Sequence, residues 1–506
     1  MNQANETLLF STEFMIILTL LIPLMGIIIA GFVKNPKIRD ISTILTGATL
    51  FLCVTTFIPL IRQGISPKLE IVEIFPNISL MFQLEWLGLL FALVASFLWP
   101  ITTIYANGYM NGNKEKNQPR FYLFFALSIF AVMGIAFSGN MFTLFCFYEL
   151  LTLATFPLVT HSGTEEAKRS GRIYLGILIG TSIFFLLPAI VWTYHLAGTL
   201  DFVKGGIIDF HHGGVLNNRL TVFTAGALLF LYMYGIGKAA LMPFHRWLPA
   251  AMVAPTPVSA LLHAVAVVKA GVFTVVKVII YIFGTRNLTE LINESWASGA
   301  WLTYAAGFTI IAASVVALRQ DNLKKRLAYS TISQLSYVIL AVSILAPKAV
   351  LAAGFHILAH AVGKITLFFA AGAIYTASKK KYVSELDGIG RRMPITMICF
   401  TIGALSMIGL PPAVGFLTKY YMLLGAFEYG NFFAIGVIIL STLLNAAYFL
   451  PIIFNAWFKP EKAGVKSHGE APKAILFAIS ITGFLTIALF FAPDLFLWLA
   501  EEPSVR

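Results

Sequence analysis

The stretch YMYGIGKAALMPFHRWLP, residues 232–249, places a lysine inside a long apolar run that a proline interrupts. Proline removes one backbone hydrogen bond and clashes with the preceding turn, so a helix through Lys238 is expected to break near Pro243. A charge beside a break in an apolar run is typical of an interrupted membrane helix that lines a polar path. The other apolar runs decide whether the whole chain lies in a membrane.

Apolar runs of about twenty residues recur along the chain, which is 506 residues long, 58% hydrophobic and only 11% charged, with a mean hydropathy of +0.84. Roughly 20 apolar residues cross the ~30 Å hydrocarbon core, and backbone groups in lipid must satisfy their own hydrogen bonds. The alternating pattern of a membrane β-barrel is absent. We therefore predict an all-α polytopic membrane protein.

The three cysteines, at positions 53, 146 and 399, lie inside apolar runs and form no CxxC pair. This disfavours a disulfide framework and an iron–sulfur or zinc site, so we expect no cofactor, no metal and no redox or catalytic residue. The net charge of +12 comes from short basic clusters between apolar runs, which favours cytoplasmic loops over a nucleic-acid-binding face. The first apolar run leads directly into KNPKIRD, which favours a retained first helix over a cleaved signal peptide.

We predict fourteen membrane helices, numbered 1 to 14 in chain order, at 13–33, 40–62, 81–107, 121–138, 140–161, 173–198, 221–248, 257–282, 298–318, 328–346, 349–376, 394–425, 431–458 and 474–499. Of the 35 lysines and arginines, 23 lie in or beside the loops after odd-numbered helices, and seven lie in the other loops and the tails. The positive-inside rule then places the odd-numbered loops in the cytoplasm and both termini outside.

The other five basic residues lie within predicted helices: Lys238, Lys269, Lys277, Lys364 and Lys419. Glu149, in LFCFYELLTLATF, is the only acid deep in an apolar span, because Glu85 falls near a predicted helix end. A lone charge at the bilayer centre costs on the order of 2.5–3.5 kcal/mol on insertion scales. For Lys277, reaching the interface through its long stem is an equal alternative to a buried role. For the others we favour buried amines that exchange protons, with Glu149 as the natural partner of Lys238.

A second interruption is predicted in helix 12, where GLPPAVGFLTK places Pro411 and Pro412 ahead of Lys419. A simple packing kink is the alternative. Two interrupted helices that are five apart in order, each with a lysine, favour an internal inverted repeat. The predicted organisation is helices 1–3 in 1–120, a first repeat of helices 4–8 in 121–282, a second repeat of helices 9–13 in 298–458, and helix 14 in 474–499.

Helix 11 reads AGFHILAHAVGKITLFFAAG, and its His356, His360 and Lys364 stack on one face at i, i+4 and i+8. Plain hydrogen bonding between helices is one alternative. Metal binding is disfavoured because the HExxH glutamate is missing and the third group is a lysine. A proton relay is favoured, since histidine titrates near neutral pH. In helix 8, His263 and Lys269 are six residues apart and are expected to line the same bundle interior.

Four linked strings carry a resemblance: KAALMPFHRWLPAAMVAPTPVSALLHAVAVVKAG, RQDNLKKRLAYSTISQLSYV, HILAHAVGKITLFFAAG and MIGLPPAVGFLTKYYML. They resemble the antiporter-like subunits shared by respiratory complex I, membrane-bound hydrogenases and Mrp-type multisubunit cation/proton antiporters. The likeness covers most of the chain and is strongest from about residue 120 to 425. It implies fourteen helices in two inverted five-helix repeats, with helices 7 and 12 broken, and a subunit that works only inside a larger membrane complex.

The resemblance also implies roles for single residues. Glu149 resembles the family's helix 5 glutamate, Lys238 the helix 7 lysine that pairs with it, Lys269 the central helix 8 lysine, His356, His360 and Lys364 the helix 11 relay, and Lys419 the terminal charge on helix 12. In the family these groups form a charged axis along the membrane midplane. Opening the glutamate–lysine pair there changes the proton affinity of the lysines that follow.

The function implied is that of a proton-conducting membrane subunit of an Mrp-type sodium/proton antiporter, in a bacterial or archaeal cytoplasmic membrane. Its partners would be other membrane subunits, and the chain length is most similar to a D-type subunit. The lysine at position 419 disfavours the complex I subunit type with glutamate there, and AMVAPTPVSALLHA resembles the large subunit type, which is longer. Two alternatives stay open: the same module coupled to an NADH:quinone oxidoreductase or hydrogenase, and a stand-alone secondary transporter.

Overall fold

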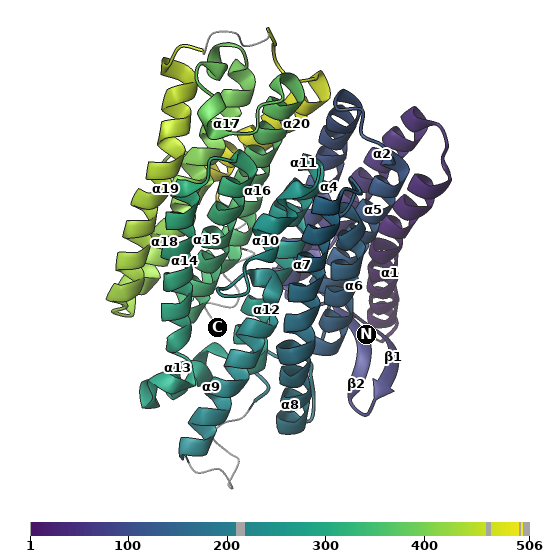
Figure 1. Cartoon of the computed structure of the whole chain (residues 1–506). Helices are drawn as coiled ribbons and strands as arrows, with labels where there is room; N and C mark the ends of the chain where they lie inside the picture. Colours follow the sequence, from purple (N-terminus) through teal and green to yellow (C-terminus); the bar gives the residue numbers. More distant parts are fainter. Residues whose placement is uncertain (1, 209–217, 462–466, 495–496, 499–506) are drawn as a thin grey trace.

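The computed structural model describes residues 2–208, 218–461, 467–494 and 497–498, which form a bundle of long helices lying side by side (Figure 1). Within these residues, 11 helices are long and apolar enough to cross a membrane, and two shorter apolar helices, Val222–Gly235 and Pro394–Ile408, are parts of interrupted spans. The predicted class, an all-α polytopic membrane protein, is confirmed. The count of fourteen spans and the inverted repeat stay predictions.

The first part of the chain comprises α1 (Asn2–Phe32), α2 (Pro36–Thr55), α3 (Ile58–Arg62), β1 (Lys68–Phe75), β2 (Ile78–Gln83), α4 (Trp86–Gly112), α5 (Gln118–Ala136), α6 (Met141–Val159), α7 (Glu165–Thr181) and α8 (Leu187–Ala197). A single π-helical segment, Ser182–Leu186, joins α7 to α8. These helices correspond to the first six predicted ranges.

The second part comprises α9 (Asn218–Gly235), α10 (Trp247–Ala250), α11 (Thr256–Ala260), α12 (Val267–Lys277), α13 (Thr285–Glu294), α14 (Trp301–Arg319), α15 (Leu323–Ser343), α16 (Pro347–Ser378), α17 (Pro394–Ile408), α18 (Val414–Glu428), α19 (Phe432–Phe458) and α20 (Lys473–Phe491). Two π-helical segments, Leu261–Val265 and Val278–Phe283, extend α11 and α12 into one span. The predicted end of helix 14, residue 499, lies outside the described residues.

The start of predicted helix 3 is wrong, because residues 78–83 form the second strand of an antiparallel hairpin. The helix α4 begins only at Trp86, since the carboxylate of Glu85 caps it by accepting hydrogen bonds from the backbone N–H groups of Leu87 and Gly88 at 2.8 and 3.0 Å. The strand β2 is anchored to α6 by the Met81 N–H, which donates to Thr143 Oγ1. The strand sequence KLEIVEIF is shorter than a strand of a membrane β-barrel. Searching the sequence for the alternating pattern of such a barrel therefore does not detect this hairpin.

The helix α13 was not predicted either, because it is short and polar on one face. Figure 1 places it at the same end of the bundle as the β-hairpin and the start of α9. This end corresponds to loops that the distribution of basic residues assigns to the outside of the membrane.

The helix α16 is the centre of the second half of the bundle. It contacts α15, α17, α18 and α20, and it also reaches α4, α11 and α12 of the first half. Its side chains from Ala349 to Ile374 are buried, and the polar ones among them are His356, His360, Lys364 and Thr366. The helix that carries the predicted relay therefore packs against both halves of the bundle.

Candidate functional site

Predicted helix 7 is interrupted at the lysine. The helix α9 ends at Gly235, Lys238 lies in a 3₁₀ turn at Gly237–Ala239, and regular helix resumes only at Trp247. The indole Nε1 of Trp247 donates to the carbonyl of Gly237 at 3.0 Å, which supplies one partner for the opened backbone. The predicted break therefore exists, and it starts before Pro243 rather than at it.

The ammonium of Lys238 is fully buried against α6. It donates to the backbone carbonyl of Tyr148 at 2.8 Å and to Thr152 Oγ1 at 2.6 Å, and it lies 3.2 Å from the centre of the Tyr148 ring. Glu149 follows Tyr148 on the same helix, close enough for its charge to act on Lys238. The two groups do not touch, however: both carboxylate oxygens of Glu149 are buried and lack a hydrogen-bond partner among the described residues.

The helix α12 passes directly over the break. A Cβ atom at Gly271 would lie 2.3 Å from the backbone nitrogen of Ala239, so only glycine permits this approach. Two residues earlier on α12, the ammonium of Lys269 is hydrogen-bonded to His360 Nδ1 on α16. Both side chains are almost completely buried. This contact connects the half of the chain that holds Lys238 to the half that holds α16.

His263 lies in the π-helical segment before α12 and is buried, but it does not join this contact. Both of its ring nitrogens lack a hydrogen-bond partner among the described residues, and its ring lies 4.7 Å from that of Phe368. The structure thus brings together Lys269 and His360, and it leaves His263 beside them as a neighbouring buried imidazole.

Along α16, the other two predicted relay residues have separate partners. His356 Nδ1 is hydrogen-bonded to Thr418 Oγ1 on α18 at 2.8 Å, and its ring stacks 6.0 Å from that of His360. The ammonium of Lys364 donates to Ser330 Oγ on α15 at 2.9 Å. The i, i+4 pair of histidines is therefore continuous with Lys269 at one end and with α18 at the other, whereas Lys364 branches toward α15.

Lys419 lies beside the second interruption, between the end of α17 at Ile408 and the start of α18 at Val414. Its ammonium donates to the carbonyl of Ile408 at 2.7 Å, to that of Met407 at 3.3 Å and to Thr442 Oγ1 at 3.2 Å. The turn after α17 begins at Gly409, whose φ of +87° is left-handed and favours glycine. The prolines at 411 and 412 thus separate two half-helices, and hydrogen bonds from the Lys419 ammonium on α18 connect them across the gap.

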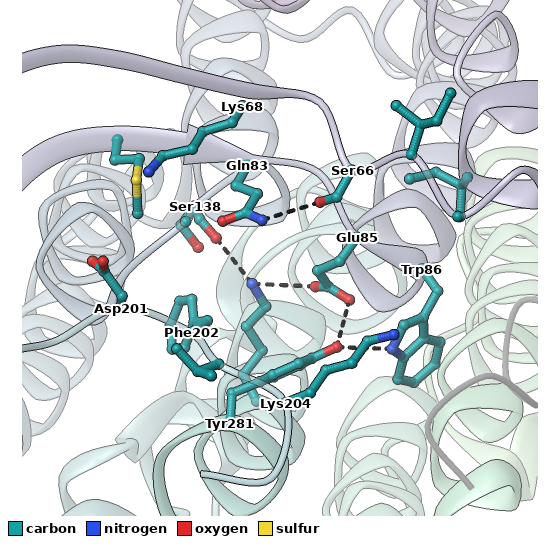
Figure 2. Close-up of a pocket in the computed structure, with 17 residues that line it drawn as sticks. Ser66, Lys68, Gln83, Glu85, Trp86, Ser138, Asp201, Phe202, Lys204 and Tyr281 are labelled. Atoms are coloured by element: carbon teal, nitrogen blue, oxygen red, sulfur yellow. Dashed lines mark hydrogen bonds and ion pairs between the residues drawn. The ribbon is translucent and has the colours of Figure 1, made fainter. Parts of the chain in front are cut away.

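Lys277 does not reach the interface, which was one of the two positions expected for it. Its ammonium is fully buried and forms an ion pair with Glu85 Oε1 at 3.2 Å, and it donates to the carbonyl of Ser138 at 2.9 Å. Lys277 lines a pocket together with Glu85, Trp86 and Tyr281. Figure 2 shows this pocket, in which Tyr281 donates to Glu85 and Trp86 donates to Tyr281. Glu85 is therefore an acid in direct contact with a buried lysine, which its place at a predicted helix end concealed.

Several residues that hydrogen-bond to the site lysines and histidines were not identified from the sequence. Tyr148 and Thr152 could have been identified from it, because they are i, i+4 neighbours on the helix of Glu149 and face the same side. Thr418 adjoins Lys419 but has no pattern of its own, and Ser330 is one of several hydroxyls on α15. No group of three or more metal-binding side chains occurs among the residues described.

Comparison with known proteins identifies the family of the chain. A family model described as the transmembrane part of NADH:quinone oxidoreductase and Mrp antiporter subunits matches residues 138–445. The chain belongs to this family. The match spans both interrupted helices and every residue of the predicted proton path, from Glu149 to Lys419.

Two relatives of this family have different names but the same sequence identity to the chain. NADH-quinone oxidoreductase subunit N of Desulforudis audaxviator is 31% identical, over 79% of this chain and 78% of its own length. The A-type subunit of the Na(+)/H(+) antiporter of Alkalihalophilus pseudofirmus is also 31% identical, over 85% of this chain but only 55% of its own length. The chain thus spans about half the length of the antiporter relative.

Two solved structures share the fold. A chain of the membrane-bound sulfane sulfur reductase, an archaeal respiratory membrane complex, superposes with a TM-score of 0.82 at 24% identity and covers 97% of this chain and 96% of its own. A chain of the Mrp complex from Dietzia superposes with a TM-score of 0.81 at 19% identity, over 98% and 97%. At these identities the likeness establishes the fold of nearly the whole chain and nothing finer.

Proposed function

We propose that the chain is a proton-translocating membrane subunit of a multisubunit Mrp-type cation/proton antiporter. The observation that carries the proposal is the contact between Lys269 and His360, because it joins a buried lysine of one half to a buried histidine file of the other. Burying two titratable groups against each other in a membrane costs free energy, and groups buried at that cost mark functional sites. Proton transfer between the halves is a function that this pair can perform.

In this proposal Glu149 is the switch partner and Lys238 the gated proton carrier. The ammonium of Lys238 donates hydrogen bonds to two neutral oxygens of α6. The carboxylate of Glu149 accepts no hydrogen bond from any of the described residues. Bringing the two charges together stabilises protonated Lys238, and separating them favours release of its proton. The proton then passes to Lys269 and His360.

Beyond that contact, His360 and His356 lead to Thr418 and so to Lys419, which acts as the exit-side group. Lys364 serves as a branch toward α15, and His263 as an additional buried proton acceptor next to Lys269. Some imidazole nitrogens of His263, His356 and His360 have no hydrogen-bond partner in the described part of the chain, and through these atoms water can join the groups.

A second candidate is the same proton path coupled to an oxidoreductase. The relative named NADH-quinone oxidoreductase subunit N favours it, because the chain covers 78% of that protein, against 55% of the A-type antiporter relative. In this case the partners are redox subunits and the chain moves protons alone. A D-type place in an Mrp complex rests on chain length, and a stand-alone transporter has no observation in its favour.

For the membrane arrangement we propose the cytoplasmic membrane of a bacterium or archaeon, with both termini outside. The support is the concentration of 23 basic residues at one set of loops. The partners proposed are other membrane subunits, with H⁺ and Na⁺ as the ions.

The experiment is purification of the tagged chain in mild detergent from its native host, identification of the co-purifying subunits, and transport assays on everted vesicles. The antiporter proposal expects small membrane subunits and a pH gradient that added Na⁺ or K⁺ dissipates. Co-purifying nickel–iron or quinone-reducing subunits, with no response to either cation, would instead establish the second candidate. A lone, active polypeptide would contradict both.

A further inference from the structure

We propose that the pocket in Figure 2 is an outward-facing site for a monovalent alkali cation, in which the ammonium of Lys277 occupies the cation's place until it loses its proton. This rests on the proposed function, since it names where an antiported cation would exchange with the outside. It concerns residues that the proton path from Glu149 to Lys419 does not use.

The pocket is large enough to be filled by solvent. Its volume of about 400 Å³ is lined by the β-hairpin, by the turn between α5 and α6, by the segment that follows α8, and by the π-helical end of the α12 span. Such a volume holds on the order of ten water molecules. It lies at the end of the bundle that carries the hairpin, which is the end assigned to the outside.

In the lining of the pocket, two oxygen atoms and an aromatic ring lie close to the ammonium of Lys277. Glu85 Oε1 lies 3.2 Å away, the carbonyl of Ser138 lies 2.9 Å away, and the ring of Phe202 faces the ammonium at 4.1 Å. Carboxylate and carbonyl oxygens are the ligands that hard cations prefer, and an aromatic face also attracts a cation. The ammonium of Lys277 therefore lies among the kinds of groups that bind a metal cation.

The carboxylate of Glu85 is held in position without help from Lys277. It accepts hydrogen bonds from the backbone N–H groups of Leu87 and Gly88 and from the hydroxyl of Tyr281 at 3.0 Å. The Tyr281 hydroxyl in turn accepts from Trp86 Nε1 at 2.8 Å. Because these bonds persist when the ammonium withdraws, the carboxylate stays preorganised for another cation.

Charge makes the two occupants exclude each other. Besides Glu85, Lys277 and the Tyr281 hydroxyl, the titratable groups that line the pocket are Lys68, Asp201 and Lys204. With Lys277 protonated, its ammonium already pairs with Glu85, and a second cation at the same place is repelled. When Lys277 gives its proton to the water of the pocket, one alkali cation can bind Glu85 in its place. One proton leaves and one cation enters, so the charge of the site is unchanged.

The test uses two substitutions of Lys277 with opposite expected effects, in the intact complex in right-side-out vesicles. Lys277→Met removes the competing charge, so the apparent affinity for external Na⁺ should rise and its dependence on external pH should weaken. Lys277→Arg keeps a charge that cannot be released, so Na⁺ affinity should fall by at least about tenfold. Glu85→Gln removes the charge but keeps one acceptor oxygen for the start of α4, and it should also lower Na⁺ affinity. The matched control is Lys348→Met, which opens an exposed ion pair with Glu428.

A labelling experiment tests the site without relying on transport. Lys277→Cys is made in a chain whose three cysteines are replaced by serine, and an impermeant cationic thiol reagent is added from outside. Labelling should occur from this side only, and Na⁺ should slow it relative to choline. Labelling from the inside alone, equal rates in Na⁺ and choline, or Na⁺ affinities of both Lys277 variants equal to wild type, would overturn the site. Failure of the proposed function is distinct, because wild-type complex would then show no cation-coupled proton movement.

Discussion

The two interrupted helices each place a lysine at a gap, yet they hold it in different ways. Lys238 lies inside the first gap, and its ammonium crosses to the neighbouring helix α6, where Tyr148 and Thr152 accept its hydrogen bonds. Lys419 lies on the second half of its own helix, and its ammonium turns back to the carbonyl of Ile408, at the end of the first half. One lysine is held by a neighbouring helix, and the other by the end of its own interrupted helix with one further bond to Thr442 on α19.

This difference indicates where the charge can be switched. Carbonyl groups at the C-terminal end of a helix carry a fixed partial negative charge, so the environment of Lys419 changes little unless the backbone moves. The helix that holds Lys238 also carries Glu149, whose carboxylate is near but not in contact. A small movement of α6 or of the gap therefore alters the charge around Lys238. We expect Lys238 to be regulated and Lys419 to be a constant terminus.

The largest effect is expected from the regulated pair. Glu149→Ala and Lys238→Ala should each reduce proton-coupled transport to background, because each removes one member of the only switch in the proposed path. The measurement is the rate of pH-gradient formation or dissipation in everted vesicles, with complex levels quantified in the same membranes. Wild-type rates in either variant at normal complex levels would mean that the contrast between the two lysines is wrong.

A smaller effect is expected at the constant terminus. Lys419→Ala should slow transport by about tenfold, since hydrogen bonds of a charged group are worth about 1.5–3 kcal/mol. Lys419→Arg should recover much of the rate, because an arginine can still donate to the carbonyl oxygens at the end of α17. If Lys419→Arg is as slow as Lys419→Ala, a fixed positive charge is not what this position supplies.

The smallest effect is expected from the neutral support of Lys238. Thr152→Val should slow transport by about fivefold, corresponding to about 1 kcal/mol for one hydrogen bond. Thr155→Val is the matched control, since Thr155 lies on the same helix but bonds to Tyr174 rather than to Lys238. Equal losses in the two variants, measured as initial rates, would show that the bond to Lys238 has no special weight.

Much of this arrangement was predictable from the sequence because lipid imposes simple rules. Long apolar runs, prolines beside Lys238 and Lys419, and the i, i+4 spacing of His356 and His360 are local patterns with local causes. Each predicted a feature that the structure contains: the helical membrane fold, the two gaps and the shared face of α16. The roles of these residues in proton transfer remain predictions.

What escaped prediction depends on contacts between distant parts of the chain. Glu85 and Lys277 are far apart in sequence, and neither lies in a pattern that indicates the other. Glu85 was assigned to a helix end, which is correct for its backbone, but its carboxylate also faces Lys277 across the bundle. The β-hairpin was missed for a related reason, since its short strands are stabilised by packing on α6.

The central claim is that protons cross between the two halves at Lys269 and His360. The direct measurement is the initial rate of proton translocation in everted vesicles for Lys269→Met, His360→Leu and the double variant, at equal complex levels. Each single variant is predicted to fall below about a tenth of the wild-type rate, and the double variant to be no slower than either, because all three remove the same connection. Wild-type rates in a single variant, or losses that multiply in the double variant, would contradict the claim.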